Sequence, residues 1–225
     1  TLTDSKRYFP ALATPPPNLA KLLGRVRQLT EEYKAGNRQS IKSFRELVSL
    51  LLSLTIMKAG GGVQLVLLKN EEKKGVIGGR KGPTDPLPLT NGRYLRLSMS
   101  LELTDTPEGP RLKVYDSSFQ YQLDRDGKRW IFRYDYLRHP TSQHPSAHFQ
   151  IRGKLTEQSV LRQGHPLERI HFPTSRVSLE AIIRLLAIQF GVKCNEPPEI
   201  WQPVLAESEH LFFKIAHLPV SGPGE

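Results

Sequence analysis

The stretch "YLRLSMSLELTDTPEGPRLKVYDSSFQYQLDRDGKRWIFRYDY", residues 94–136, decides the fold. Apolar and polar residues alternate along its three segments, which is the period of a half-buried β-strand. "DTPEGP" turns the chain after the first segment, and the Asp-Gly pair of "DRDGK" is a strong hairpin signal before the third. The stretch therefore predicts an antiparallel meander in which alternate side chains face opposite ways.

Helical periodicity precedes the meander. Apolar residues keep helical spacing over residues 19–33 and again over residues 41–54, which predicts a helical hairpin capped by Asn18 and Ser40. "VQLVLLK" (63–69) predicts a buried strand, and the Gly- and Pro-rich residues 73–92 predict a long basic loop.

More strands and helices follow the meander. Alternation predicts a strand over residues 147–151 and a short one over 170–172, and Ser178 is placed to cap a further helix. A last helix is expected from about Pro203 to Leu218. This order predicts an α+β protein: a central antiparallel sheet with an N-terminal helical hairpin and C-terminal helices.

The chain is expected to divide into four parts. Residues 1–17 form a flexible Pro-rich leader, residues 18–60 the helical hairpin, residues 61–177 the β core with the candidate site, and residues 178–225 the C-terminal helices packed on that core. We find no internal repeat.

Composition narrows the class of partner. The 225 residues carry a net charge of +10 and the pI is about 9.8, which favours nucleic acid or another polyanion. The single cysteine, Cys194, excludes a disulfide framework and a Cys-rich zinc site. The longest apolar run, residues 47–57, is too short to span a bilayer, so we expect a cytoplasmic protein with no membrane partner.

Polar residues on three predicted strands form one set. Each alternates with apolar residues that face the core, so all of them face the other way and would be neighbours if the strands are adjacent. The set consists of Arg133, Asp135, His148, Gln150, Arg152, Arg169 and His171.

Such a set suits phosphodiester cleavage without metal or other cofactor. We expect His148 and His171 to act as acid and base, with His144 as a substitute for either. Arg133, with Arg152 or Arg169, would stabilise the charged phosphorane, and Asp135 would orient a histidine. An ordinary solvated sheet face explains the same pattern equally well.

Two other features suggest ligands. His139, His144 and His148 could hold a metal ion, although their spacing matches no well-known zinc motif. Arg80 and Lys81 in "GVIGGRKG" could touch phosphates from a mobile loop.

The helix start near Ser178, with Arg176 beside it, could bind a phosphate, or Ser178 could simply cap the helix.

The hairpin "FQYQLDRDGKRWIFRYDYLRHP" followed by "HPSAHF", together residues 119–149, resembles the small bacterial toxins of the TumE type. The Arg-Tyr-Asp motif beginning at Arg133 matches the family's motif, and His144 and His148 stand where the family has paired histidines. The resemblance implies action on RNA or translation and a helix-turn-helix antitoxin as protein partner.

The interpretation that follows is a basic, toxin-like, RNA-directed protein that acts as a metal-independent ribonuclease. The alternatives are a non-catalytic module that binds nucleic acid or a protein, and a metal-dependent nuclease with histidine ligands. Self-association is left open.

Overall fold

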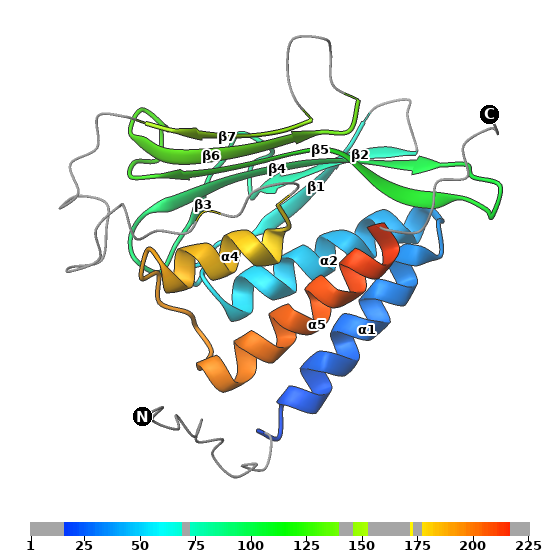
Figure 1. Cartoon of the computed structure of the whole chain (residues 1–225), viewed down its shortest axis with the longest axis horizontal. Coiled ribbons are helices and arrows are strands. Elements are labelled where there is room, and N and C mark those ends of the chain that lie inside the picture. The colour runs from blue at the N-terminus through cyan, green and yellow to red at the C-terminus, as the bar shows by residue number, and fades with distance from the viewer. Residues whose placement is uncertain (1–15, 69–72, 140–145, 153–171, 173–176, 217–225) are drawn as a thin grey trace, which may run out of the picture.

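A seven-stranded antiparallel sheet packs against a layer of helices in the computed structural model, which describes residues 16–68, 73–139, 146–152, 172 and 177–216 (Figure 1). The strand order is β1-β2-β4-β5-β6-β7, and β3 pairs with β4. The strands are β1 (Val63–Leu67), β2 (Lys74–Gly79), β3 (Leu87–Pro88), β4 (Tyr94–Thr104), β5 (Arg111–Gln122), β6 (Trp130–Leu137) and β7 (Ala147–Ile151). The predicted α+β class and the antiparallel meander, β4 to β7, are confirmed.

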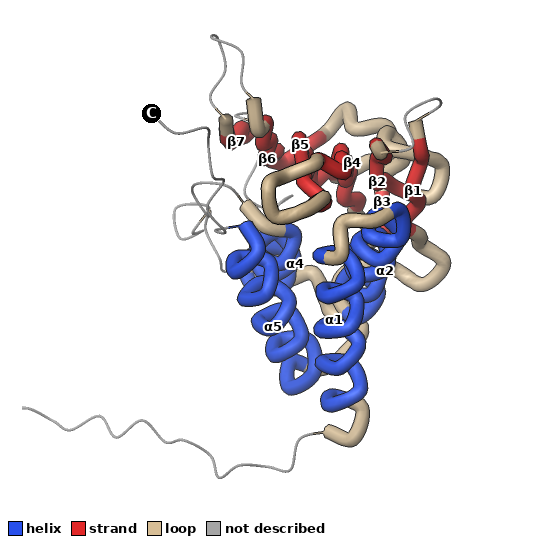
Figure 2. Tube along the Cα trace, turned by 90° about the vertical axis from the view of Figure 1, so that its right-hand side faces the viewer, coloured by secondary structure: helices blue, strands red, loops and turns tan. Residues whose placement is uncertain are grey.

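The described helices all lie on one side of the sheet, as Figure 2 shows. They are α1 (Leu19–Lys34), α2 (Arg38–Leu54), α4 (Leu179–Ile188) and α5 (Pro198–Ala216). α1 packs against both α2 and α5, so the two ends of the chain build one helical layer. The other face of the sheet is left without a helix from the described part of the chain (Figure 1).

The helix starts differ from the predictions in three places. Asn37, not Ser40, caps α2: its side chain accepts a hydrogen bond from the Gln39 N–H at 2.9 Å. Ser40 completes a capping box by accepting from the Asn37 N–H at 3.0 Å. Asn18 precedes α1 but its side chain makes no capping hydrogen bond. α5 begins at Pro198, because a proline at the first helical position needs no N–H partner.

Two predictions about strands were wrong. Residues 73–92 are not one long loop, since they contain β2 and β3. Glycines in β2 let the following segment cross close to it: a Cβ on Gly79 would lie 1.9 Å from the Asp85 carbonyl oxygen. β1 is an exposed edge strand rather than a buried one. Phe172 lies in no strand, and the rest of the strand predicted over residues 170–172 lies outside the described residues.

The core lies between the sheet and the helices. The apolar residues of each strand of the meander alternate toward the helical layer, where burial supplies the main favourable free energy of folding. Phe132 is fully buried and its ring centroid lies 5.6 Å from that of Tyr121 and 5.3 Å from that of Phe190. Other fully buried core residues are Ile41, Leu52, Ile77, Leu95, Leu97, Ile182, Ile183 and Leu186.

A buried carboxyl group joins α4 to α5. Ser178 caps α4 as predicted, accepting from the Ala181 N–H at 3.1 Å. Glu180 follows it and accepts a hydrogen bond of 2.6 Å from the Ser208 hydroxyl, beside a cavity of about 30 Å³. Burial raises the pKa of Glu180, because the neutral form is favoured where water is excluded. The protonation state of Glu180 therefore affects the stability of the helical layer.

Candidate functional site

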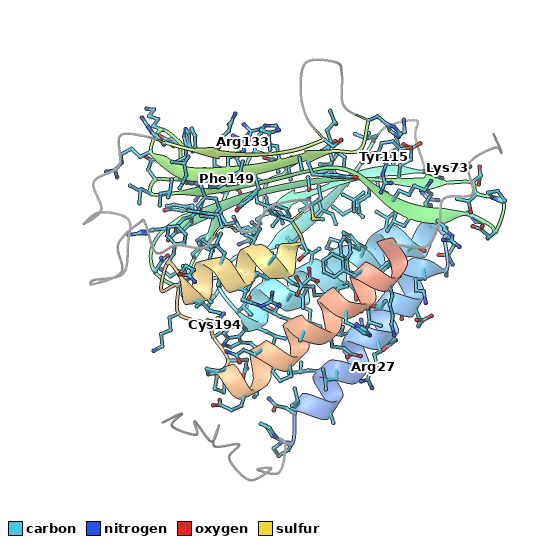
Figure 3. The ribbon with its side chains drawn as sticks, in the orientation of Figure 1. Arg27, Lys73, Tyr115, Arg133, Phe149 and Cys194 are labelled. Atoms are coloured by element: carbon cyan, nitrogen blue, oxygen red, sulfur yellow. The ribbon has the colours of Figure 1, made fainter. Side chains whose placement is uncertain are left out.

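Polar side chains occupy the face of the sheet that no described helix covers. Strand register sets eight of them in two neighbouring rows, one residue from each strand of the meander. We call them the arginine row, which consists of Arg96, Gln120, Arg133 and Gln150, and the serine row, which consists of Ser98, Ser118, Asp135 and His148. Figure 3 shows Arg133 on the side of the sheet away from the helices. We refer to this side as the open face.

Asp135 is the centre of the charged contacts on the open face. The Arg133 Nε lies 2.8 Å from Oδ1 and 2.7 Å from Oδ2 of Asp135. The His148 Nε2 lies 3.2 Å from Oδ2. The Asp135 side chain is only 14% exposed, whereas His148 is 33% and Arg133 is 44% exposed. The carboxylate is thus shielded beneath two groups that solvent can reach.

The contacts of Asp135 differ in quality. Oδ1 accepts a well-directed hydrogen bond from Arg133. Oδ2 is buried and accepts none with good geometry from the described residues, although His148 and Arg133 are both close to it. The His148 Nε2 and Asp135 Oδ2 atoms are therefore close without forming a directed hydrogen bond. Catalytic contacts are often loose without substrate and tighten only in its complex.

The order within the serine row excludes one familiar mechanism. Asp135 lies between Ser118 and His148, because β6 lies between β5 and β7. A nucleophilic serine needs the histidine beside it and the carboxylate beyond the histidine. This arrangement does not give Ser118 a base, which leaves His148, Asp135 and Arg133 as the candidate catalytic groups.

The turn between β5 and β6 makes contacts with segments on both sides of it in the sequence. Arg125 in this turn donates to Asp85 at 2.7 Å, and Asp85 also accepts from the Lys81 N–H at 3.1 Å. Arg152 at the end of β7 donates to the carbonyl oxygen of Lys128 in the same turn. Of two predicted phosphate-binding residues, Arg152 contacts this hairpin through its side chain, whereas Lys81 is linked to it only through its backbone N–H and Asp85. Arg80 lies instead beside Gly62, at the start of β1.

Several predicted site residues lie outside the described residues. They are His144, Arg169, His171 and Arg176. The second imidazole of the predicted acid–base pair is therefore not placed. Of the predicted metal ligands, His139 is exposed with its ring 5.7 Å from that of Tyr115. Within the described ranges, no three His, Cys, Asp or Glu side chains gather as a metal site would require.

The phosphate site considered at the start of α4 meets acidic side chains. The Ser178 hydroxyl accepts from the Ala181 N–H and donates to Glu209 at 2.9 Å, and Glu180 lies two residues after it in the first turn of α4. Carboxyl groups at these positions disfavour a bound anion, so capping is the role that the contacts of Ser178 support.

Cys194 is partly buried, and burial raises the pKa of its thiol to about 11. A thiol with so high a pKa stays protonated at neutral pH and is a poor nucleophile.

Four members of the two rows were not singled out from the sequence. These are Arg96, Ser98, Ser118 and Gln120. Alternation already placed Arg96 and Ser98 opposite core residues, which is a usable signal. Alternation does not give the strand register, which sets Arg96 in the same row as Arg133 and Ser98 in the same row as Asp135.

None of the helices in the described ranges is long and apolar enough to cross a bilayer. Comparison of the chain with family models, curated proteins and solved structures found no match. The resemblance to TumE-type toxins therefore stays a prediction.

Proposed function

We propose that the open face binds RNA and that His148, Asp135 and Arg133 cleave its phosphodiester bonds without a metal ion. The observation that carries the proposal is the contact of one shielded carboxylate with both a histidine and an arginine on a solvent-facing surface. A structural ion pair on a sheet surface needs only two partners. The third group, an imidazole, adds the ability to move a proton near neutral pH.

Each group has a defined role in the proposed reaction. The Nε2 atom of His148 faces Asp135, so the carboxylate favours the tautomer with its proton on that nitrogen. Nδ1 is then the atom that accepts the proton of the 2′-hydroxyl as this oxygen attacks the phosphorus. Asp135 stabilises the imidazolium that forms, as a buried carboxylate does in other acid–base sites.

Arg133 and Arg96 would hold the phosphate. Arg133 uses Nε for Asp135, which fixes the plane of its guanidinium group. Its terminal nitrogens are suited to the non-bridging oxygens, whose negative charge grows in the transition state. Arg96 is exposed in the same row, with Gln120 between the two arginines. The reaction also needs an acid for the leaving 5′-oxygen, and His144 and His171 are the two candidates that the sequence offers.

The test is cleavage of a single-stranded, uridine-containing RNA oligonucleotide in excess EDTA. His148→Ala should lower the single-turnover rate by about a hundred-fold or more, the usual contribution of one general base. His210→Ala is the matched control, since His210 is exposed on α5, and it should leave the rate unchanged. An oligonucleotide with 2′-deoxyribose at every position should resist cleavage.

Three results would contradict the proposed reaction or favour one of the alternatives. Cleavage by His148→Ala at the parent rate would remove His148 from the reaction. Loss of the parent activity in EDTA would favour the metal-dependent alternative with histidine ligands. RNA binding without any cleavage would make the open face a non-catalytic binding surface.

A further inference from the structure

β1 is an edge strand of the sheet, and the backbone groups of alternate residues point away from β2. Within the described residues it pairs only with β2. The Leu68 N–H donates to the Lys74 carbonyl at 3.3 Å, so residues 64, 66 and 68 direct their N–H and C=O groups toward β2. By the alternation of an antiparallel ladder, the backbone groups of Val63, Leu65 and Leu67 face outward.

The side chains of this edge are uncharged and, apart from Gln64, apolar. Val66, Leu67 and Leu68 are 37%, 40% and 42% exposed. Residues 63–68 carry no charged side chain, in a chain whose net charge is +10. Proteins normally protect an exposed edge with charged residues, prolines or bulges, because a bare edge pairs with other strands. The opposite edge, β7, carries His148 and is followed by Arg152.

We propose that β1 pairs with β1 of a second copy of this chain, antiparallel and about a two-fold axis at Leu65. The axis sets Leu65 against its own copy and Val63 against Leu67 on both sides, which pairs all three outward-facing residues. These side chains lie on the helix-facing side of the sheet, since Leu65 pairs with the fully buried Ile77. An isologous contact of this kind closes at two copies.

The absence of charge along β1 and the self-complementary order of its outward-facing residues favour a second copy as the occupant. Two molecules with a net charge of +10 repel each other overall, so contact between copies is least opposed where charged side chains are absent, as they are from residues 63–68. An acidic partner would instead be drawn to the cations of the open face. Paired side chains of an antiparallel ladder point the same way, so the two open faces would lie on one side of a continuous sheet. That consequence bears on RNA only if the proposed function holds; the dimer itself does not depend on it.

The first test is the mass of the full-length chain by sedimentation equilibrium over a wide concentration range. The parent should approach twice its 25.5 kDa mass. Val66→Lys sets a charge across from the partner's edge and should weaken association by about tenfold or more, as like charges near one another on paired strands do. Ile188→Lys is the control: Ile188 is 48% exposed on α4, and the same substitution there should leave the dimer intact.

Amide hydrogen exchange tests the register. The Leu65 and Leu67 N–H groups should gain protection as concentration rises, whereas the Val66 N–H, already bonded within the sheet, should not change. A parent chain that stays monomeric overturns the proposal, as does equal dissociation by Val66→Lys and Ile188→Lys. Protection of Leu65 and Leu67 at every concentration also overturns it, because a segment of the same chain would then cover the edge.

Discussion

The two faces of the sheet are built by the same strands and differ in almost every physical respect. Phe132 and Arg133 are consecutive residues of β6. Phe132 is fully buried among aromatic rings beneath the sheet, while Arg133 is 44% exposed above it and contacts Asp135. Alternation of side chains along a strand is enough to separate them.

This difference gives the two faces unequal weight in the stability of the fold. The helix-facing side gains free energy from burial of apolar area, which is large and insensitive to the chemistry of single groups. The open face gains little from its ion pairs, since exposed pairs contribute about 0–1 kcal/mol. Substitution of its residues should therefore cost the fold little. Substitutions on the helix-facing side should lower the stability of the fold, whereas substitutions on the open face should lower RNA binding and leave stability nearly unchanged.

The largest contrast is expected between neighbouring residues. Phe132→Ala should lower the free energy of unfolding by about 3–5 kcal/mol, the usual loss when a buried ring is removed. Arg133→Ala should lower it by about 1 kcal/mol or less, because its salt bridge is partly exposed. Urea denaturation followed by circular dichroism measures both. Similar losses of unfolding free energy in the two variants would show that the two faces contribute alike to stability, contrary to the contrast drawn above.

A smaller effect should come from Glu180 in the helical layer, and it depends on pH. Burial raises the pKa of this carboxyl group in the folded protein above its value in the unfolded chain. Its contribution to stability is therefore fully present below the ordinary pKa of glutamate and is lost as pH rises through the raised value. Glu180→Gln stays neutral and should raise the free energy of unfolding at neutral pH, by an amount on the order of 1 kcal/mol.

The pH profile is the check on that prediction. The advantage of Glu180→Gln over the parent should shrink as the pH is lowered through the acid range. Denaturation curves that keep the same separation at every pH would mean that Glu180 does not titrate as its burial requires. RNA affinity should be the same in parent and variant.

The smallest effect is expected at the cap of α2. Asn37→Ala removes the side chain that accepts from the Gln39 N–H, and should lower the free energy of unfolding by about 1 kcal/mol. Since the cap lies in the helical layer, RNA affinity measured on the folded protein should not move. A change in affinity would link the two sides of the molecule and break the contrast between them.

Particular residues show what the sequence could and could not predict. Alternation correctly placed Arg133 and Asp135 on one face with His148, because the period of a strand is a local property. Register is not local, so the proximity of Ser118 to Asp135 appeared only in the folded chain.

The error over residues 73–92 has a different cause. Glycine weakens a strand by propensity alone, and only the crossing of Asp85 over Gly79 explains why β2 has glycine there. The cap of α2 was misplaced for a related reason. Asn37 and Ser40 are both good capping residues, and the pattern of hydrogen bonds that assigns their positions is not visible in composition.

RNA affinity after matched charge removal distinguishes binding at the open face from a response to the overall charge of the protein. Arg96→Gln with Arg133→Gln removes two positive charges from the open face. Lys21→Gln with Lys42→Gln removes two from exposed positions on α1 and α2. Fluorescence anisotropy with a labelled single-stranded RNA, at one fixed near-physiological salt concentration, compares the two proteins at equal net charge.

The open-face variant should lose about tenfold or more in affinity, because two arginines that touch phosphate are removed. The helical-layer variant should bind as the parent does. Equal losses in both would contradict the claim, since RNA would then respond to the overall charge of the protein and not to its open face.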